Sequence, residues 1–300
     1  MEGFELHYEI EGEGPALVLI HPRGMDSRVW DTQVTTFCEH YKVISYDRQF
    51  CGKTKRNEGG QHAAGASSLE DLKRIFESRI NSPPSSSYNE LKSLLDWLGI
   101  EKCHLLGLEE GGQVALEFAV VYPEITDKLL LVNTRFPVLS DFEDPGSREK
   151  LWSGIQRGIE KAQGFGEAIQ KLVHEGDPEP LVESKLADPL YSKATPQTRQ
   201  RLRTILSENA LSVLEDFEPQ SHRLALLTED RLKEIDTPTL LILSDGERDP
   251  LARALDDRLE ELITTLRTVV IPDASPMANM DRPEEFNRMV LEFLGIPRDI

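Results

Sequence analysis

Two adjacent carboxylates, Glu109 and Glu110, are enclosed by glycines where a predicted strand meets a predicted helix. The pattern predicts a strand over 103–107 and a helix over 111–122, which places Glu109 at a helix N-terminus. Burial raises a carboxyl pKa and a helix N-terminus lowers it, so the sequence leaves the protonation state of Glu109 open. Proton transfer is available in either state, and acid/base chemistry is therefore the first expectation.

Short apolar runs alternate with helical spacing along most of the chain and would position these carboxylates. After an alternating segment over 4–10, turn residues at 12–15 precede the first buried run. Strands buried on both faces and separated by helices predict an α/β fold with a mostly parallel central sheet flanked by helices. The expected strands are 16–20, 42–46, 103–107, 129–132, 239–243 and 268–271, and the expected helices are 88–98, 111–122, 251–263 and 283–294.

The alternation stops between about 140 and 235, where charged, helix-favouring stretches are interrupted by prolines. We expect an inserted helical cap over 140–235, with the core formed by 1–139 and 236–300. In a second polar stretch, 55–87, we expect one helix over 69–80. We expect this stretch to form a surface segment that extends toward the site.

Composition limits the partners of the chain. A formal charge of −19 keeps it soluble and argues against nucleic acid and anionic membrane surfaces as partners. The three cysteines are widely spaced and form no metal motif, so neither a metal nor a cofactor is expected. No apolar run approaches the roughly 20 residues of a membrane span and no leader segment is readable. We expect a cytoplasmic monomer or homodimer that binds a small molecule.

The segment Gly107-Leu108-Glu109-Glu110-Gly111-Gly112 resembles the nucleophile elbow of the α/β-hydrolases, a strained turn between strand and helix. The resemblance covers nearly the whole chain outside the cap and implies the α/β-hydrolase fold. Further family signatures are His21-Pro22-Arg23-Gly24 at the oxyanion loop, Tyr46-Asp47-Arg48 after the next strand, Gly246-Glu247-Arg248-Asp249-Pro250 at the acid loop and Arg282-Pro283-Glu284-Glu285-Phe286 at the last helix.

Two of the three catalytic residues that the resemblance implies are replaced. Glu109 stands in the nucleophile position, and Pro276 stands where the family has its catalytic histidine. Only the acid remains, as Asp249. Proline cannot exchange a proton, so ordinary serine-dependent acyl transfer is excluded.

The family's oxyanion hole is also altered. The amide of Glu110 would supply one donor, but Pro22 has no amide hydrogen, so the second donor would come from Arg23 or Gly24. The resemblance brings the cation of Arg23 close to Glu109, where we expect an ion pair. His21, at the end of a strand, is expected to brace this loop.

Relatives of this fold that act on halides and epoxides use a carboxylate nucleophile, usually an aspartate, with a histidine that activates the releasing water. A Glu109 ester would lack that route, so covalent turnover is disfavoured. Without an intervening imidazole, a water or a substrate would bridge Glu109 and Asp249. Two carboxyl groups with separated pKa values supply a general acid and a general base.

Three functions follow as expectations. The first is a cofactor-independent, non-hydrolytic enzyme of lyase, cyclase, isomerase or dehydratase type that acts on a small, largely apolar metabolite. The second is an inactive pseudo-hydrolase that binds a ligand or partner, its Glu109 locked against Arg23 or Arg48. The third is an atypical hydrolase of an epoxide, ester or carbon–carbon bond with a displaced catalytic set, in which either a cap histidine, His174 or His222, is the base or Glu109 activates a water. The cap aromatics Phe142, Trp152 and Phe165 are expected in the cap core or along the pocket.

Overall fold

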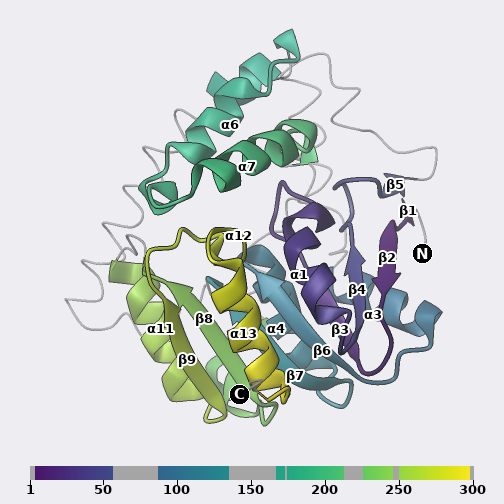
Figure 1. The fold of residues 1–300 in the computed structure, drawn as a ribbon. Coiled ribbons are helices and arrows are strands. Elements are labelled where there is room, and N and C mark those ends of the chain that lie inside the picture. The colour runs from purple at the N-terminus through teal and green to yellow at the C-terminus, as the bar shows by residue number, and fades with distance from the viewer. Residues whose placement is uncertain are drawn as a thin grey trace.

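A seven-stranded, mostly parallel sheet forms the centre of the molecule (Figure 1). The computed structural model describes residues 4–56, 87–134, 167–172, 174–212, 226–245 and 250–297. The sheet has the order β2-β4-β3-β6-β7-β8-β9, and only its edge strand β2 runs antiparallel to its neighbour. Its strands are β2 (Tyr8–Glu11), β3 (Ala16–Ile20), β4 (Lys42–Tyr46), β6 (Cys103–Leu108), β7 (Thr126–Val132), β8 (Thr239–Ser244) and β9 (Leu266–Ile271).

The expected fold class is confirmed, and the differences lie in element ends and at the N-terminus. β3 and β4 have the predicted bounds. Each of the other parallel strands is longer than expected by one to three residues at one of its two ends. The alternating segment over 4–10 is divided into two strands. Its first part, β1 (Phe4–Glu5), leaves the main sheet and pairs with β5 (Lys55–Arg56).

Helices cover both faces of the sheet because its central strands, such as β3, are apolar on both sides. α1 (Asp31–Phe37) and α13 (Pro283–Leu294) contribute Phe37 and Phe286 to one buried cluster. α3 (Ser87–Leu98), α4 (Glu110–Val121) and α11 (Pro250–Leu262) contribute to the cluster on the other face. Alternate residues of one strand enter opposite clusters, as Leu17 and Val18 do.

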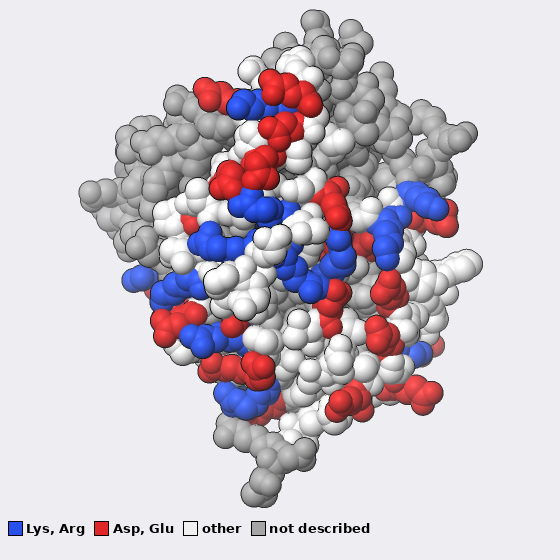
Figure 2. Space-filling model, turned by 45° about the horizontal axis from the view of Figure 1, so that its top comes forward, with Lys and Arg blue, Asp and Glu red and all other residues white. Residues whose placement is uncertain are grey.

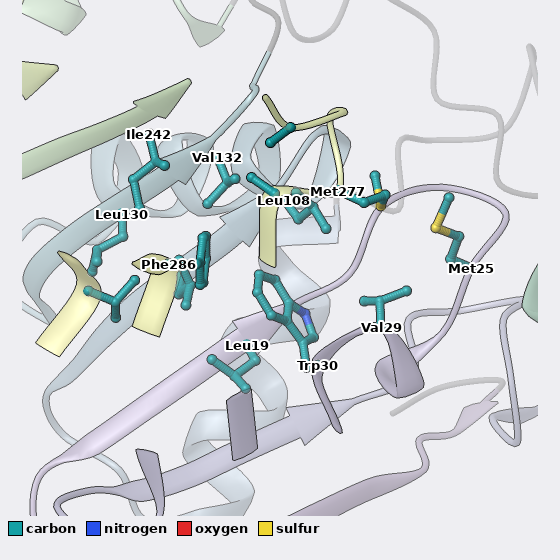
Figure 3. Close-up of a cluster of buried hydrophobic side chains, with 14 of the residues drawn as sticks. Leu19, Met25, Val29, Trp30, Leu108, Leu130, Val132, Ile242, Met277 and Phe286 are labelled. Atoms are coloured by element: carbon teal, nitrogen blue, oxygen red, sulfur yellow. The ribbon is translucent and has the colours of Figure 1, made fainter. Parts of the chain in front are cut away.

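The first of these clusters supports two residues that flank the unusual positions of the site. Leu108, which precedes Glu109, and Met277, which follows Pro276, are both fully buried in it, together with Trp30 of η1 (Ser27–Trp30) and Phe286 (Figure 3). A close-packed core restrains the backbone next to each of these side chains. The elbow and the loop after β9 are therefore anchored from below by one common core.

The described residues between β7 and β8 include helices that lie over the carboxyl ends of the parallel strands (Figure 1). α6 (Glu179–Leu186), η3 (Pro189–Tyr191) and α7 (Pro196–Glu208) place Leu186, Tyr191 and Leu202 in the same buried cluster as the sheet. The cap range of 140–235 stays a prediction as a domain boundary. Near its end, α10 (Glu229–Lys233) packs against α11, and Leu232 joins the other core cluster.

Basic and acidic side chains are interspersed on the face seen from the side of these helices (Figure 2). Ion pairs join Arg203 to Glu183 within the cap and Arg201 to Asp31 across to the core. The formal charge of −19 is thus not gathered on the described part of this face. Within the described ranges, no helix is long and apolar enough to cross a membrane.

Asn209, which ends α7, connects the cap to the core. Its side-chain oxygen accepts from the amide of Gly52 at 2.7 Å, and its side-chain nitrogen donates to Asp26 at 2.7 Å and to the carbonyl of Ile205 at 2.9 Å. Burial raises the pKa of Asp26, but hydrogen bonds from Arg28 and Asn209 lower it by more. Asp26 is therefore a carboxylate, and these two hydrogen-bond donors stabilise its negative charge.

Asn209→Ala should therefore lower the free energy of unfolding by about 2 kcal/mol, because the amide of Gly52 and the buried carboxylate of Asp26 each lose a hydrogen bond. Urea denaturation would measure this change. Asn89→Ala is the matched control, since Asn89 is exposed and bonds only the hydroxyl of Tyr122 among the side chains described. Equal losses in the two variants would contradict the proposed connection.

Candidate active site

Glu109 occupies a sharp turn between β6 and α4, with φ 49° and ψ −114°. Such a backbone conformation costs a residue with a side chain about 1–3 kcal/mol. The turn is close-packed, because a Cβ at Gly111 would collide with the carbonyl oxygen of Ile20 and one at Gly112 with the side chain of Thr134. The elbow geometry therefore exists in this chain with a carboxylate at its tip.

The cap supplies the contacts of that carboxylate. The Tyr191 hydroxyl donates to Glu109 Oε1 at 3.3 Å, and Lys185 Nζ lies 3.5 Å from Oε2. Lys185 Nζ also lies 5.3 Å from the centre of the Tyr191 ring. The Glu109 side chain keeps 16% of its surface exposed, so it is enclosed but not sealed.

Both cap groups carry their protons at neutral pH. Burial and the charge of Glu109 raise the pKa of Tyr191 well above its ordinary value. Burial acts to lower the pKa of Lys185, but the charges of Glu109 and Glu110 and the hydrogen bond with Tyr191 raise it by more. An ammonium group and a phenol therefore face Glu109, and both can donate to its oxygens.

Arg23 has a different neighbour from the one expected. The described cation that contacts Glu109 is Lys185, so the expected ion pair between Arg23 and Glu109 is wrong, as is the alternative with Arg48. The charge of Arg23 acts instead on Glu110. Burial raises the pKa of Glu110, but the charges of Lys185 and Arg23 lower it by more, which makes Glu110 a second carboxylate in the site.

His21 lies at the end of β3 and braces the loop that follows. Pro22 O can only accept, so His21 Nδ1 donates to it at 2.8 Å, and His21 Nε2 accepts from the amide of Arg48 at 2.9 Å. Burial and the charge of Arg48 lower the pKa of His21, so the ring is neutral and fully engaged. Gly24, in the same loop, has φ 71°. The oxyanion donors, Glu110 and either Arg23 or Gly24, stay predictions.

The neutral ring of His21 should make the protein less stable as the pH falls below about 6.5, the ordinary pKa of histidine. The unfolded chain binds the proton first, so one such histidine removes up to about 1.4 kcal/mol from the free energy of unfolding per pH unit below that value. His104 adds to the effect, because burial lowers its pKa too. Urea titrations at pH 7 and 5.5 would show a smaller loss in His21→Gln than in the native protein. His40→Gln, at an exposed site, should keep the full loss.

Pro276 lies buried in the loop after β9. Asn133, in a left-handed conformation at the end of β7, donates to the Pro276 carbonyl at 2.9 Å and accepts from the amide of Ser244 at 2.9 Å. On the other side, Asp281, the last residue of α12 (Ala278–Asp281), accepts from Ser275. The loop expected to hold a catalytic histidine is thus fixed around a side chain without acid/base capacity.

The structure gives no described place in the site to several of the expected residues. His174 is exposed. Asp249, His222, Phe142, Trp152 and Phe165 lie outside the described residues, as does the expected helix over 69–80. Among the described residues, no group of three or more His, Cys, Asp or Glu side chains could hold a metal ion. Sequence reasoning missed Lys185, Tyr191 and Asn133.

The sheet order, the strained turn after β6 and the cap over the strand ends define an α/β-hydrolase-fold protein. A family model described as the alpha/beta hydrolase family matches residues 17–289. The chain therefore belongs to the alpha/beta hydrolase family.

Proteins similar to this chain carry several names. A putative carbamate hydrolase, RutD, of Pseudomonas savastanoi is 26% identical over 97% of this chain and 98% of that protein. A putative 2-succinyl-6-hydroxy-2,4-cyclohexadiene-1-carboxylate synthase of Bacillus subtilis is 25% identical over 96% of this chain and 95% of its own. Among solved structures, an esterase of Thermogutta terrifontis is similar with a TM-score of 0.68 and 22% identity, covering 97% of this chain and 93% of that one, which supports the fold.

Proposed function

We propose that this chain is an enzyme that transfers a proton on a small, largely apolar organic molecule, with Glu109 as the acid/base group. The observation that carries the proposal is the strained elbow with a partly exposed carboxylate at its tip. A backbone that costs energy is typical of functional positions. The proton donors Tyr191 and Lys185 around the carboxylate favour its use as a base.

The chemistry we propose is non-hydrolytic, of the lyase, cyclase, isomerase or dehydratase class. Hydrolysis through a covalent ester needs a base that activates water, and buried Pro276 cannot be that base. Within the described residues, the ring nitrogens of His21 are occupied and His174 is exposed. We keep Asp249 as the proposed second carboxyl group, and no cofactor or metal is required by the proposal.

A second candidate function is a pseudo-hydrolase that binds a small molecule without changing it. Its supporting observation is that the cap contacts both oxygens of Glu109, through Tyr191 and Lys185, as expected of a closed site. A third, an atypical hydrolase in which Glu109 activates water, is favoured by relatives that are named hydrolases and esterases.

One labelling experiment separates these three functions. The native protein and Glu109→Gln are incubated with a small-molecule extract of the source cells in ¹⁸O-labelled water, and the components are followed by chromatography and mass spectrometry. The proposal expects a product that depends on Glu109 and has not gained the elements of water, relative to a sample without protein that records spontaneous exchange of carbonyl oxygen. A product that has gained water, with ¹⁸O beyond that exchange, would support hydrolysis. A component that copurifies unchanged would support the pseudo-hydrolase.

A further inference from the structure

Packing within the core holds the Tyr191 side chain against Glu109. Its side chain is 1% exposed and lies in the core cluster shared by cap and sheet, while its hydroxyl donates to Glu109 Oε1 at 3.3 Å. Lys185, the penultimate residue of α6, places its ammonium group beside both. The cap thus puts a fixed O–H group one hydrogen bond away from the proposed base.

We propose that Tyr191 is a second catalytic residue, the proton donor that works with Glu109, and that the substrate is a carbonyl compound with hydrogen on the carbon next to the carbonyl. This inference rests on the proposed function. Because donor and base lie one hydrogen bond apart, the substrate atoms that gain and lose a proton must also be close neighbours. A carbonyl oxygen and its α-carbon, two bonds apart, meet that condition.

The proton balance of this step closes without a co-reactant. The Glu109 carboxylate takes the proton from the α-carbon, and the electron pair of that C–H bond forms a C=C bond to the carbonyl carbon. The π pair of the C=O bond moves to oxygen, which takes the proton of Tyr191 to give the enol. Glu109 is then protonated and Tyr191 is a phenolate, and the proton returns from Glu109 to Tyr191 across their contact. In a substrate with a C=C bond beside the α-carbon the enol is a dienol. If Glu109 keeps its proton and delivers it to the far carbon of that dienol, while the enol O–H returns its proton to the Tyr191 phenolate, the C=C bond is shifted, the C=O bond is restored and both residues regain their starting states.

The charges around Tyr191 fit this sequence. Burial and the negative charge of Glu109 raise the pKa of Tyr191, whereas the charge of Lys185 lowers it. When Glu109 accepts a proton, its charge disappears and the influence of Lys185 remains. Tyr191 therefore becomes a stronger acid at the step in which it must donate. Glu110 also faces this group and acts against the change, since its charge raises the pKa of Tyr191. We infer that Lys185 is a positioning residue whose charge supports the donor.

The test is hydrogen–deuterium exchange at the α-carbon of three probes, cyclohexanone, acetophenone and 2-oxobutanoate, followed by proton NMR in deuterated water. We expect the native protein to accelerate exchange in at least one probe. Tyr191→Phe should slow that exchange about 10-fold to 100-fold, within the range of a general acid. Tyr191→Phe should also change the dependence of the exchange rate on pH. A loss of packing alone would leave that dependence unchanged.

Tyr41→Phe is the matched control. Tyr41 is 4% exposed and its hydroxyl donates to the Leu294 carbonyl at 3.3 Å, so the variant removes a comparable buried hydroxyl far from Glu109 in the fold. It should exchange at the native rate. A Tyr191→Phe variant with the native rate and pH profile would overturn the role of Tyr191.

The remaining outcomes separate this inference from the proposed function. Native protein without exchange in any probe would overturn the carbonyl assignment, while turnover in the extract experiment would still support Glu109. Exchange that survives in Glu109→Gln would overturn both, because the base itself would then be elsewhere.

Discussion

Glu109→Gln should reduce turnover by about 10²-fold to 10⁴-fold, the contribution usual for a positioned general acid or base. Glutamine has nearly the same shape and its amide oxygen can still accept from Tyr191, so the contacts of the site are largely kept. What glutamine cannot do is take a proton. The rate of product formation from the component that the native protein consumes would measure the effect.

The fold of this variant should be nearly unchanged, which makes a loss of activity interpretable. The ion pair between Glu109 and Lys185 spans 3.5 Å, and 38% of the lysine side chain is exposed, so its loss costs less than about 1 kcal/mol. Glu101→Gln is the matched control, because Glu101 is exposed and lies in the turn before β6. Native turnover in Glu109→Gln would end the acid/base proposal for Glu109 and would mean that other groups carry out the reaction.

Much of the fold could be predicted because its signals are local. Strands such as β3 are continuous apolar runs bounded by turn residues, and a helix such as α13 has strong apolar periodicity behind a proline. α1 was missed because its sequence, Asp-Thr-Gln-Val-Thr-Thr-Phe, has only two large apolar residues. Its position is decided by packing against α13.

The elbow could be predicted for the same reason, and the groups around it could not. Gly107, Gly111 and Gly112 lie beside Glu109 in the sequence, and the resemblance of this short motif to the nucleophile elbow implies the tight turn. Tyr191 lies 82 residues away, so its contact with Glu109 depends on how the cap is placed on the core.

Lys185 and Asn133 gave weak signals for different reasons. Lys185 belongs to a charged helix, and such patterns usually indicate a solvated face. The contact of Lys185 with Glu109 forms only when the cap is folded over the end of β6. Asn133 follows a strand, where asparagine commonly ends an element, and its bond to Pro276 spans 143 residues. Arg23 is the cation that the family resemblance implies beside Glu109, yet its charge acts on Glu110.

Gly111→Ala should destabilise the protein by about 2–3 kcal/mol, although alanine is favoured over glycine by about 1 kcal/mol within a helix. Gly111 has an ordinary negative φ at the start of α4, so an alanine would suit the backbone itself. The cost comes from the added Cβ, which would meet the carbonyl groups of Ile20 and His21. Those atoms belong to the end of β3 and the braced loop, and a backbone cannot rotate away as a side chain does.

The sign of the change in stability therefore tests the packing of the elbow. Gly99→Ala is the control, because Gly99 has φ 65° and open space around its Cβ position, so it should lose only the roughly 1–2 kcal/mol of left-handed strain. Urea denaturation of both variants would give the two values. To relieve the clash, α4 must move away from β3, which would shift Glu109 relative to Tyr191 and lower activity beyond the loss of stability. An increase in the stability of Gly111→Ala would contradict this expectation. It would mean that α4 and β3 leave enough room for a Cβ at Gly111.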